Sequence, residues 1–479
     1  MRGYKNNMLR SFVNSLPYPI KQGAKYIYSA IPPRFRYGKA FWDTYNFLQE
    51  SQWWSREQLE EYQMKQLEKL LKHAYENVPY YRRVFDERGL WPKDVRDFND
   101  LKKLPFLTKE IIRNNFNNLM AKNLSKSMFQ YVSTSGSTGI PLQFYEEKRI
   151  TNAREMAFHW RMRNWIEYKF TDKCAVLRGN VVKRFEKNKR AWWEYTPVDK
   201  LLILSLYDMT EENLFKYEKK LTEFQPKFIQ AYPSGITILA RFMRKHDIEL
   251  IYPIMAILCG SENLYSSQRE MLEETFKCRV FSWYGHSEQA VLAGECEKST
   301  YYHIFPEYGV TELIRSNGSP VNHEGGVGEI VGTGFNNYAM PFIRYKTGDL
   351  AVYTKQKCSC GRNYQLIEKV EGRQQEFIIA KDGHLISLGD MQIFFVFDNI
   401  KQFQFYQFKQ GEVVFKIVKK DTYTEEDTSH ILRSLYDRIG GSVKVYIEFV
   451  DKIPRTDSGK YRFLIQKLSV NFEGCLKLK

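Results

Sequence analysis

The chain has 479 residues, of which 43% are hydrophobic and 27% charged, and its formal net charge is +16. Because a single hydrophobic core stops growing well below this length, we expect at least two domains. No apolar run reaches the roughly 18 residues of a membrane-spanning helix, and seven cysteines, an odd number, favour a reducing compartment over a disulfide framework.

The first 40 residues carry eight basic side chains and no acidic one, and so supply half of the net charge. We place a basic arm at 1–50 and expect it to be solvated and folded against the main body. Contact with an anionic membrane surface, at the inner face of the membrane, is the alternative. The start lacks the apolar stretch and cleavage site of a secretory signal, which predicts a cytoplasmic protein. No nucleic-acid-binding module is recognisable, so no nucleic-acid partner is expected.

Helical periodicity begins at Ser55, and the helix should end near Asn77 because Pro79 disfavours helical geometry in the residue before it. Thr108 should cap a short helix. Beyond these helices, short buried strands alternate with amphipathic helices, a pattern that predicts a mostly parallel α/β sheet. The strands are expected at 174–179, 201–206, 228–234, 255–262 and 279–288, and the helices at 151–167, 211–226, 235–246 and 264–276.

From about residue 301 the predicted elements are strands separated by glycine-rich turns, which indicates a β-rich subdomain. Its strands are expected at 308–314, 328–335, 340–353 and 364–373. After Arg373 a shorter α+β stretch follows, with strands at 376–380, 403–408, 412–420 and 444–453 and a helix at 425–439. We therefore predict a large domain over 51–373 and a small domain over 374–479.

The segment "YVSTSGSTGIPLQFY", residues 131–145, is rich in hydroxyl side chains and glycine. Backbone amides of a glycine-containing turn converge on anions, and Ser and Thr add donors, so this segment is a candidate phosphate-binding loop. Ile140 stands where a P-loop carries lysine, which excludes a P-loop. Taken alone, the segment is equally compatible with a polar surface loop.

Six segments in order resemble the core motifs of the adenylate-forming enzymes. They are "YVSTSGSTGIP" (131–141), "CGSENL" (259–264), "WYGHSE" (283–288), "RYKTGDL" (344–350), "VEGRQQEFI" (370–378) and "PRTDSGKYRF" (454–463). Residues 74–95 and 100–110 resemble the N-terminal signature of the phenylacetate-CoA ligase branch, which includes CapK-type proteins of capsular polysaccharide biosynthesis. The resemblance spans roughly residues 55–467.

The resemblance implies a large ATP- and acyl-binding domain with a small mobile lid domain. It also implies an acid–thiol ligase that uses ATP, Mg²⁺ and coenzyme A. A small carboxylic acid attacks the α-phosphate of ATP to give an acyl-adenylate and pyrophosphate, and a thiol then displaces AMP. An aromatic acid is a candidate substrate, because Trp160, Trp165, Tyr232 and Trp283 could line a pocket. A homodimer is a candidate assembly.

The resemblance also implies roles for individual residues. Glu288 is the expected Mg²⁺ ligand, Asp349 should accept hydrogen bonds from the ribose hydroxyls, and Lys460 should lie over the α-phosphate during adenylation. Arg373 is expected at the ribose or the domain hinge, and His286 at the acyl pocket, where a catalytic role is one reading. The β- and γ-phosphates are expected to contact Ser135, Gly136, Ser137, Thr138 and Gly139. The adenine is expected to contact Gly260, Ser261, Glu262, Tyr284 and Gly285.

Cys296, His303, Cys358 and Cys360 form a possible Cys₃His set, a common structural zinc combination. The Cys-x-Cys spacing is tighter than the usual C-x₂-C, so reduced, partly buried cysteines are the alternative. Two other functions stay open beside the CoA ligase. One is an adenylate-forming or acyl-transferring enzyme of surface-polysaccharide assembly with a non-CoA acceptor, and the other is a non-catalytic membrane-associated assembly protein of the same fold.

Overall fold

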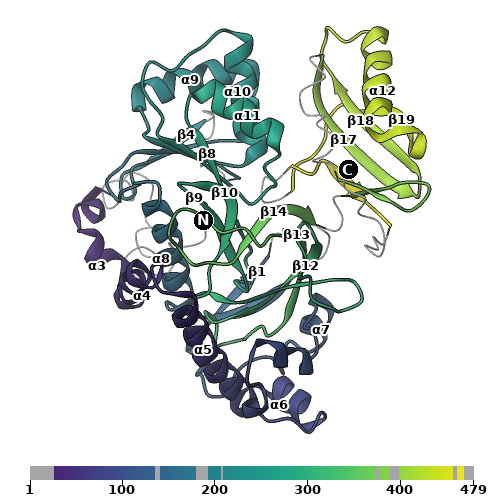
Figure 1. Ribbon diagram of the computed structural model, residues 1–479. Helices are drawn as coiled ribbons and strands as arrows, with labels where there is room; N and C mark the ends of the chain where they lie inside the picture. The colour runs from purple at the N-terminus through teal and green to yellow at the C-terminus, as the bar shows by residue number, and fades with distance from the viewer. Residues whose placement is uncertain are drawn as a thin grey trace.

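The computed structural model describes residues 26–134, 141–179, 192–206, 209–373, 377–387, 399–456 and 461–468. They form a large domain around a twelve-stranded sheet and a small domain around a four-stranded sheet, which stand as two lobes in Figure 1. Within these ranges no helix combines the length and the apolar composition needed to cross a membrane.

The described part of the expected N-terminal arm includes the helices α3 (Pro33–Tyr37) and α4 (Lys39–Ser51). Phe41 and Leu48 of α4 are fully buried and share a core cluster with residues of α8 (Thr151–Asn164). Residues 33–51 therefore pack on the large domain through an apolar face. Residues 1–25, which carry much of the basic charge, lie outside the described ranges.

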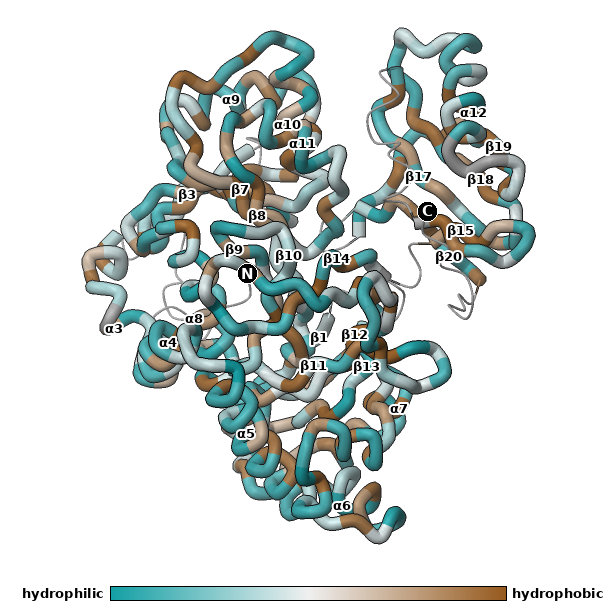
Figure 2. Tube along the Cα trace, in the orientation of Figure 1, coloured by the Kyte–Doolittle hydropathy of each residue, from teal (hydrophilic) through white to brown (hydrophobic). Residues whose placement is uncertain are grey.

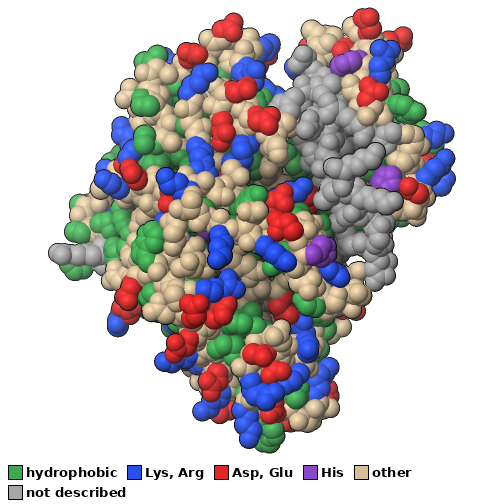
Figure 3. All heavy atoms as spheres, viewed as in Figure 1, with side chains coloured by type: hydrophobic (Ala, Val, Ile, Leu, Met, Phe, Trp, Pro, Cys, Tyr) green, Lys and Arg blue, Asp and Glu red, His purple; other side chains and the backbone are tan. Residues whose placement is uncertain are grey.

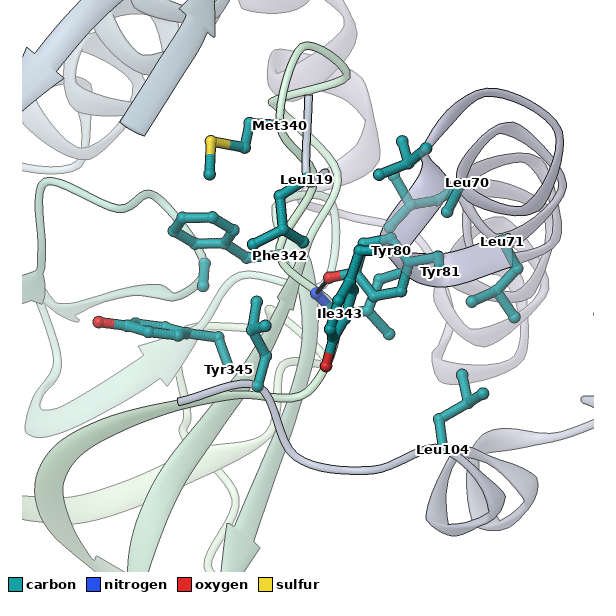
Figure 4. Packing of buried hydrophobic residues seen from close by; sticks show 14 of the residues in the cluster. Leu70, Leu71, Tyr80, Tyr81, Leu104, Leu119, Met340, Phe342, Ile343 and Tyr345 are labelled. Carbon is teal, nitrogen blue, oxygen red and sulfur yellow. Dashed lines mark hydrogen bonds between the residues drawn. The ribbon is translucent and has the colours of Figure 1, made fainter. Parts of the chain in front are cut away.

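Helix α5 (Arg56–Asn77) has the predicted bounds. The Ser55 hydroxyl accepts from the Gln58 amide in a capping box, and Val78 is extended before Pro79, which opens α6 (Pro79–Asp86). Thr108 caps α7 (Lys109–Asn114), as predicted. Figure 4 shows how α5 and α6 pack against residues 340–345, where the Tyr81 hydroxyl accepts from the Ile343 amide.

The large sheet has the strand order β11-β12-β13-β14-β10-β9-β8-β7-β6-β3-β5-β4. Helices α9 (Glu211–Phe224), α10 (Pro233–Lys245) and α11 (Ser266–Phe276) pack on one face of β3, β5, β6, β7 and β8, and α8 with α4 packs on the other. The strands of this sheet have the following bounds: β3 Cys174–Leu177, β4 Trp193–Thr196, β5 Leu201–Leu204, β6 Phe228–Ala231, β7 Ala256–Gly260, β8 Arg279–Gly285, β9 Leu292–Cys296, β10 Ser299–Ile304, β11 Gly309–Ile314, β12 Val327–Gly334, β13 Tyr345–Tyr353 and β14 Leu366–Arg373.

The sheet confirms an α/β fold and the parallel arrangement predicted for the strands between 174 and 288, and it shows how the β-rich half joins them. Only β5, β3, β6, β7 and β8 are joined by parallel pairs, and every other pair is antiparallel. The β-rich half is not a separate sheet, because β9 pairs with β8 and continues the same ladder. The strand expected at 340–353 begins only at Tyr345, since Arg344 has a φ of 51°, outside the extended region.

The small domain pairs β19 (Lys444–Phe449), β18 (Glu412–Lys419), β17 (Ile400–Lys409) and β20 (Leu464–Gln466), with α12 (Glu425–Ile439) on one face. A hairpin of β15 (Phe377–Ile379) and β16 (Leu385–Ser387) lies at its start. Figure 2 shows hydrophobic residues along the strands of both sheets and hydrophilic ones over the outer helices. On the face seen in Figure 3, the described basic and acidic side chains are intermixed.

Candidate active site

The hydroxyl-rich segment is flanked by two paired strands, β1 (Phe129–Ser133) and β2 (Gln143–Glu147). The pairing reaches Ser133 and Gln143, and beyond it the Thr134 hydroxyl accepts from the Leu142 amide at 2.9 Å. Sequence analysis predicted a loop here but not the hairpin that carries it. The predicted phosphate ligands Ser135, Gly136, Ser137, Thr138 and Gly139 lie outside the described residues, so their role stays a prediction.

Glu288 lies just after β8 with both carboxylate oxygens engaged. Oε1 accepts from the Tyr345 hydroxyl at 2.9 Å, and Oε2 lies 3.3 Å from His286 Nδ1. Burial raises the pKa of Glu288, but His286, the Lys109 charge and the Tyr345 hydroxyl outweigh it and lower this pKa to about 2. The carboxylate is therefore ionised at neutral pH without a bound cation, as a Mg²⁺ ligand must be.

The core of the large domain fixes the position of the Tyr345 hydroxyl. The Tyr345 side chain is fully buried, and its ring centroid lies 5.2 Å from that of Phe342 (Figure 4). The ring cannot move without disturbing the packing of α5 and α6, so the donor is held in place before any ligand binds. On the other side of the carboxylate, His286 Nε2 is buried and has no hydrogen-bond partner among the described residues.

Asp349 lies on β13 (Tyr345–Tyr353), and its carboxylate accepts from the Tyr284 hydroxyl at 2.8 Å. Burial, followed by the Asp349 charge, raises the pKa of Tyr284 well above its usual range, so its hydroxyl stays a donor. In the sheet Asp349 is paired with Arg373, the last residue of β14 and the last before the small domain. The residue expected at the ribose and the residue expected at the domain hinge are thus paired in the sheet.

Gly260 ends β7 and lies under an aromatic ring. A Cβ atom at this position would stand 2.8 Å from the Trp283 indole, so only glycine lets the ring pack there. The next residue, Ser261, has a φ of 70°, and its hydroxyl accepts from Arg178 Nη2 at 2.8 Å. Gly285, at the end of β8, is likewise pressed against the Leu292 side chain.

The Glu262 carboxylate forms hydrogen bonds with residues of both domains. It accepts from the Ser234 amide at 3.0 Å and hydroxyl at 3.2 Å at the N-terminus of α10. It also accepts from the Tyr461 amide of the small domain at 3.1 Å. Both oxygens are thereby occupied by protein donors. Lys460, which directly precedes Tyr461, lies outside the described residues, as does the side chain of Arg373.

The four predicted zinc ligands come together where β9, β10 and the segment before β14 meet. Their ligand atoms all lie within 4.8 Å of one another, and Cys296 and His303 are completely buried. Cys296 Sγ lies 3.5 Å from Cys358 Sγ, and Cys360 Sγ lies 3.3 Å from His303 Nε2. His303 Nδ1 lies 3.2 Å from the Tyr301 carbonyl, which directs Nε2 into the cluster. These residues fit a tetrahedral zinc ion.

Sequence analysis missed three residues that shape the site. The Tyr345 hydroxyl donates to Glu288, and the Thr347 hydroxyl accepts from the Asp349 amide at 3.0 Å. Arg178 donates to the Ser261 hydroxyl. Tyr345 and Thr347 lie inside the segment "RYKTGDL", so the motif signalled their neighbourhood but not their contacts. Arg178 lies outside every motif, and only the pairing of β3 with β6 brings it to the site.

Residues 378–467 match the family model of the CapK C-terminal domain. The chain is 28% identical over 448 residues to the protein CapK of Staphylococcus aureus, covering 90% of this chain and 94% of CapK. It is 24% identical over 449 residues to the phenylacetate-coenzyme A ligase of Thermus thermophilus, covering 85% of this chain and 96% of the ligase.

Among solved structures, 2-hydroxyisobutyryl-CoA ligase in the postadenylation state, in complex with R3-HIB-AMP, has a TM-score of 0.66 at 17% identity. The match covers 87% of this chain and 93% of that one. The chain is thus a homologue of CapK and of phenylacetate-CoA ligases, with the fold of the adenylate-forming CoA ligases. This confirms the predicted resemblance and the predicted fold class.

Proposed function

We propose that this homologue of CapK and phenylacetate-CoA ligases activates a carboxylic acid with ATP. The acid becomes an acyl-adenylate with release of pyrophosphate, and coenzyme A then displaces AMP to give a thioester. Homology to phenylacetate-CoA ligases supports adenylate-forming CoA ligation in general. That the acid is a small carboxylic acid, and that coenzyme A is the acceptor, are parts of the proposal.

The observation that carries the proposal is the joint placement of Glu288 and Asp349. Each carboxylate accepts from a tyrosine hydroxyl, that of the buried Tyr345 and that of the partly buried Tyr284 respectively, and the ring of His286 lies 6.0 Å from both tyrosine rings. One ionised carboxylate suits a divalent cation that bridges phosphate oxygens, and the other suits a ribose diol. Both roles are required by a reaction that attacks the α-phosphate of ATP.

The side chains of this site have tasks that follow from the reaction. A carboxylate is a poor acyl donor, because its negative charge repels nucleophiles and oxide is a poor leaving group, whereas AMP leaves readily. When bound, Mg²⁺ would neutralise charge on the ATP phosphates, and Glu288 is the residue that would hold it. Asp349, fixed by Tyr284, would orient the nucleotide, and the Lys460 ammonium would offset charge on the α-phosphate and the incoming carboxylate.

The test is carboxylate-dependent ATP–pyrophosphate exchange over a panel of acids, followed by product analysis with and without coenzyme A. Exchange that requires an acid, and a thioester that requires coenzyme A, are the expected results. Lys460→Ala should abolish exchange while leaving thioester formation from supplied acyl-adenylate largely intact. If no acid supports exchange and the protein does not bind ATP, the proposal is wrong.

A second candidate keeps the same activation step and replaces the acceptor. The match of residues 378–467 to the CapK C-terminal domain favours it, because this domain of the chain carries the segment around Lys460. The acyl group would then pass to a sugar or a lipid-linked sugar. Acid-dependent exchange without any coenzyme A thioester, and acyl transfer to a sugar acceptor, would favour this candidate over the first.

We also propose that Cys296, His303, Cys358 and Cys360 hold a structural zinc ion. Support comes from the convergence of the four ligand atoms and from the Lys298 amide, which donates to Cys296 Sγ at 3.3 Å. A hydrogen bond from Cys296 and the proximity of His303 lower the pKa of Cys360 although burial opposes this. Elemental analysis after purification without chelator should find about one equivalent of zinc, and less than half an equivalent would contradict the assignment.

A further inference from the structure

Glu288 lies on a tight turn that joins β8 to β9. The two strands are antiparallel, and the last pair before the turn is Gly285 with Leu292. Within the turn the Gln289 amide donates to the His286 carbonyl at 3.1 Å, and Gln289 has a φ of 53°. This left-handed backbone is uncommon for a residue other than glycine, and it persists where surrounding contacts hold it. The contacts of Gln289 therefore bear on its neighbour in the chain, Glu288.

The backbone of the turn lies directly against strand β12. A Cβ atom at Gly334 would stand 2.5 Å from the Gln289 carbonyl oxygen, and one at Gly332 would stand 2.8 Å from the Ala290 carbonyl oxygen. Both distances are shorter than real contacts of a Cβ atom, so only glycine lets the turn lie this close. The strand thereby limits how far the turn can shift towards it.

The side chain of Gln289 connects the turn to a different part of the large domain, the β1–β2 hairpin. Its Nε2 donates to Glu146 Oε1, on β2, at 3.1 Å, and both residues are buried. Gln289 Oε1 has no hydrogen-bond partner in the described part of the chain, so this one bond sets the orientation of the amide. A hydrogen bond to a carboxylate is stronger than one between two neutral groups.

Glu146 is a fixed acceptor, because its neighbours on β2 are held by hydrogen bonds. The Tyr145 carbonyl accepts from Asn337 Nδ2 at 2.8 Å, and the Glu147 carboxylate accepts from the Tyr338 amide at 3.3 Å. Side chains of β2 and of the turn also belong to one core cluster. The hairpin is therefore a rigid support from which the Gln289 side chain can be held.

The Glu288 carboxylate needs such a support in addition to its own contacts. Of its two side-chain partners, His286 belongs to the same turn and moves with it, whereas Tyr345 lies on β13. The bond between Gln289 and Glu146 adds a second attachment to an element outside the turn. Mg²⁺ requires near-ideal octahedral geometry at about 2.1 Å, so a small rotation of the turn would weaken its binding.

We propose that Gln289 and Glu146 are positioning residues for the cation site at Glu288. They act on Glu288 through the backbone of the turn. This inference rests on the proposed function, in which Glu288 holds Mg²⁺. Loss of the bond between them should weaken Mg²⁺ binding, whereas binding of the acid should stay the same.

The experiment measures the rate of ATP–pyrophosphate exchange against Mg²⁺ concentration, with an acid that supports exchange in wild-type protein. Gln289→Met keeps the approximate size of the side chain and removes the donor. The Mg²⁺ concentration at half-maximal rate should rise by about 5- to 20-fold, while the KM for the acid changes by less than about twofold. Glu146→Gln keeps an acceptor oxygen and should cause a smaller rise, of about two- to threefold.

Gln268→Met is a matched control, because Gln268 is also a buried glutamine whose Nε2 donates to a side chain, the Thr237 hydroxyl at 3.3 Å. It should leave the Mg²⁺ dependence unchanged. Glu146→Met, alone and combined with Gln289→Met, completes a double-mutant cycle. Because the two residues share one bond, the combined variant should need no more Mg²⁺ than the worse single variant.

Two results would overturn the proposal. One is a folded Gln289→Met protein with the Mg²⁺ dependence of wild type, and the other is an equal change in the Mg²⁺ requirement and in the KM for the acid. The melting temperature of each variant shows whether it is folded. If Gln289→Met does not fold, Glu146→Gln decides in the same way.

A binding measurement separates failure of this inference from failure of the proposed function. Mn²⁺, whose free ion is measured by electron paramagnetic resonance, is titrated with ATP into wild-type and Gln289→Met protein. If no acid supports exchange, but wild type binds Mn²⁺ at least about fivefold more tightly than the variant, the ligase function is rejected and the positioning role is kept. Equal binding would reject the positioning role alone, and absence of binding and exchange in wild type would reject both.

Discussion

Two polar clusters lie at opposite ends of β9 and are built in contrasting ways. Near its start, Leu292 pairs with Gly285, next to Glu288, whose carboxylate is satisfied by Tyr345 and His286. At its end Cys296 faces two more cysteines and His303. In the first cluster protein donors hold the carboxylate, whereas in the second the ligand atoms converge mainly on one another.

Under the functions proposed above, the contrast separates a site for transient ligands from a site for a permanent ion. Glu288 and Asp349 keep hydrogen-bond partners when no ligand is bound, so binding and release leave no buried charge unpaired. The thiols and the imidazole have few protein partners besides one another, and a bound metal ion would coordinate all four ligand atoms. The first site should therefore govern turnover, and the second should contribute more than the first to stability.

The largest expected effect is on stability, from loss of the cysteine cluster. Cys360→Ser removes one of four ligands, and structural zinc contributes on the order of 10 kcal/mol to small zinc-binding folds. We expect the melting temperature to fall by more than about 10 °C, with loss of bound zinc. Cys278→Ser, at a cysteine outside the cluster, is the control. A variant that loses zinc but keeps its melting temperature would show that the cluster does not stabilise the fold.

Next in size is the effect of Glu288→Gln on adenylation. The amide keeps the shape of the side chain but removes the charge that a Mg²⁺ ligand needs, so the ATP–pyrophosphate exchange rate should fall by about 10²- to 10³-fold. Glu249→Gln, at an exposed glutamate, should not change the rate. A fall of less than fivefold in Glu288→Gln would place the cation elsewhere.

The ionisation of Glu288 also predicts a pH effect on stability. Its pKa in the folded protein is about 2, below the usual 4.5, so the folded state binds this proton less tightly than the unfolded state. The resulting stabilisation is complete above pH 4.5 and is lost as the pH falls towards 2. The advantage of wild type over Glu288→Gln in free energy of unfolding should shrink by about 3 kcal/mol over that range. Denaturant titrations at several pH values measure it, and a constant difference would contradict the pKa.

The smallest expected effect comes from the hydrogen bond that orients the Asp349 carboxylate. Tyr284→Phe removes one hydrogen bond to this carboxylate, a contribution of about 1 kcal/mol. The KM for ATP should rise by about three- to tenfold, with the melting temperature within a few degrees of wild type. Tyr353→Phe, at the last residue of β13, should leave the KM unchanged. An unchanged KM in Tyr284→Phe would show that Asp349 needs no orientation.

Local sequence signals predicted the elements whose structure is decided locally. Ser55 and Thr108 cap helices as expected, and the strands and helices predicted between 174 and 288 are present, whereas β4 (Trp193–Thr196) was not predicted. The hairpin of β9 and β10 was missed, because "LAGEC" mixes small and polar residues and lacks the alternation of a half-buried strand. The continuity of the sheet was missed for a related reason, since strand order depends on contacts distant in sequence.

The site was predictable where the residue types themselves indicate a chemistry. The four metal-ligand candidates were found from residue type alone, and the structure brings them together. The role expected for Glu262 at the adenine is less well supported, because its carboxylate caps α10 and contacts Tyr461. Its partners lie 28 and 199 residues away, beyond the reach of a local pattern.

Because Glu262 bonds to residues of both domains, it affects how easily the small domain can change position. If the small domain turns and Tyr461 withdraws, Glu262 keeps its bonds to Ser234, so the movement breaks one hydrogen bond and leaves no buried carboxylate unsatisfied. Breaking it costs about 1 kcal/mol, which thermal motion supplies readily. Glu262 therefore links the two domains through one weak hydrogen bond, and a movement of the small domain would leave this carboxylate bonded to Ser234.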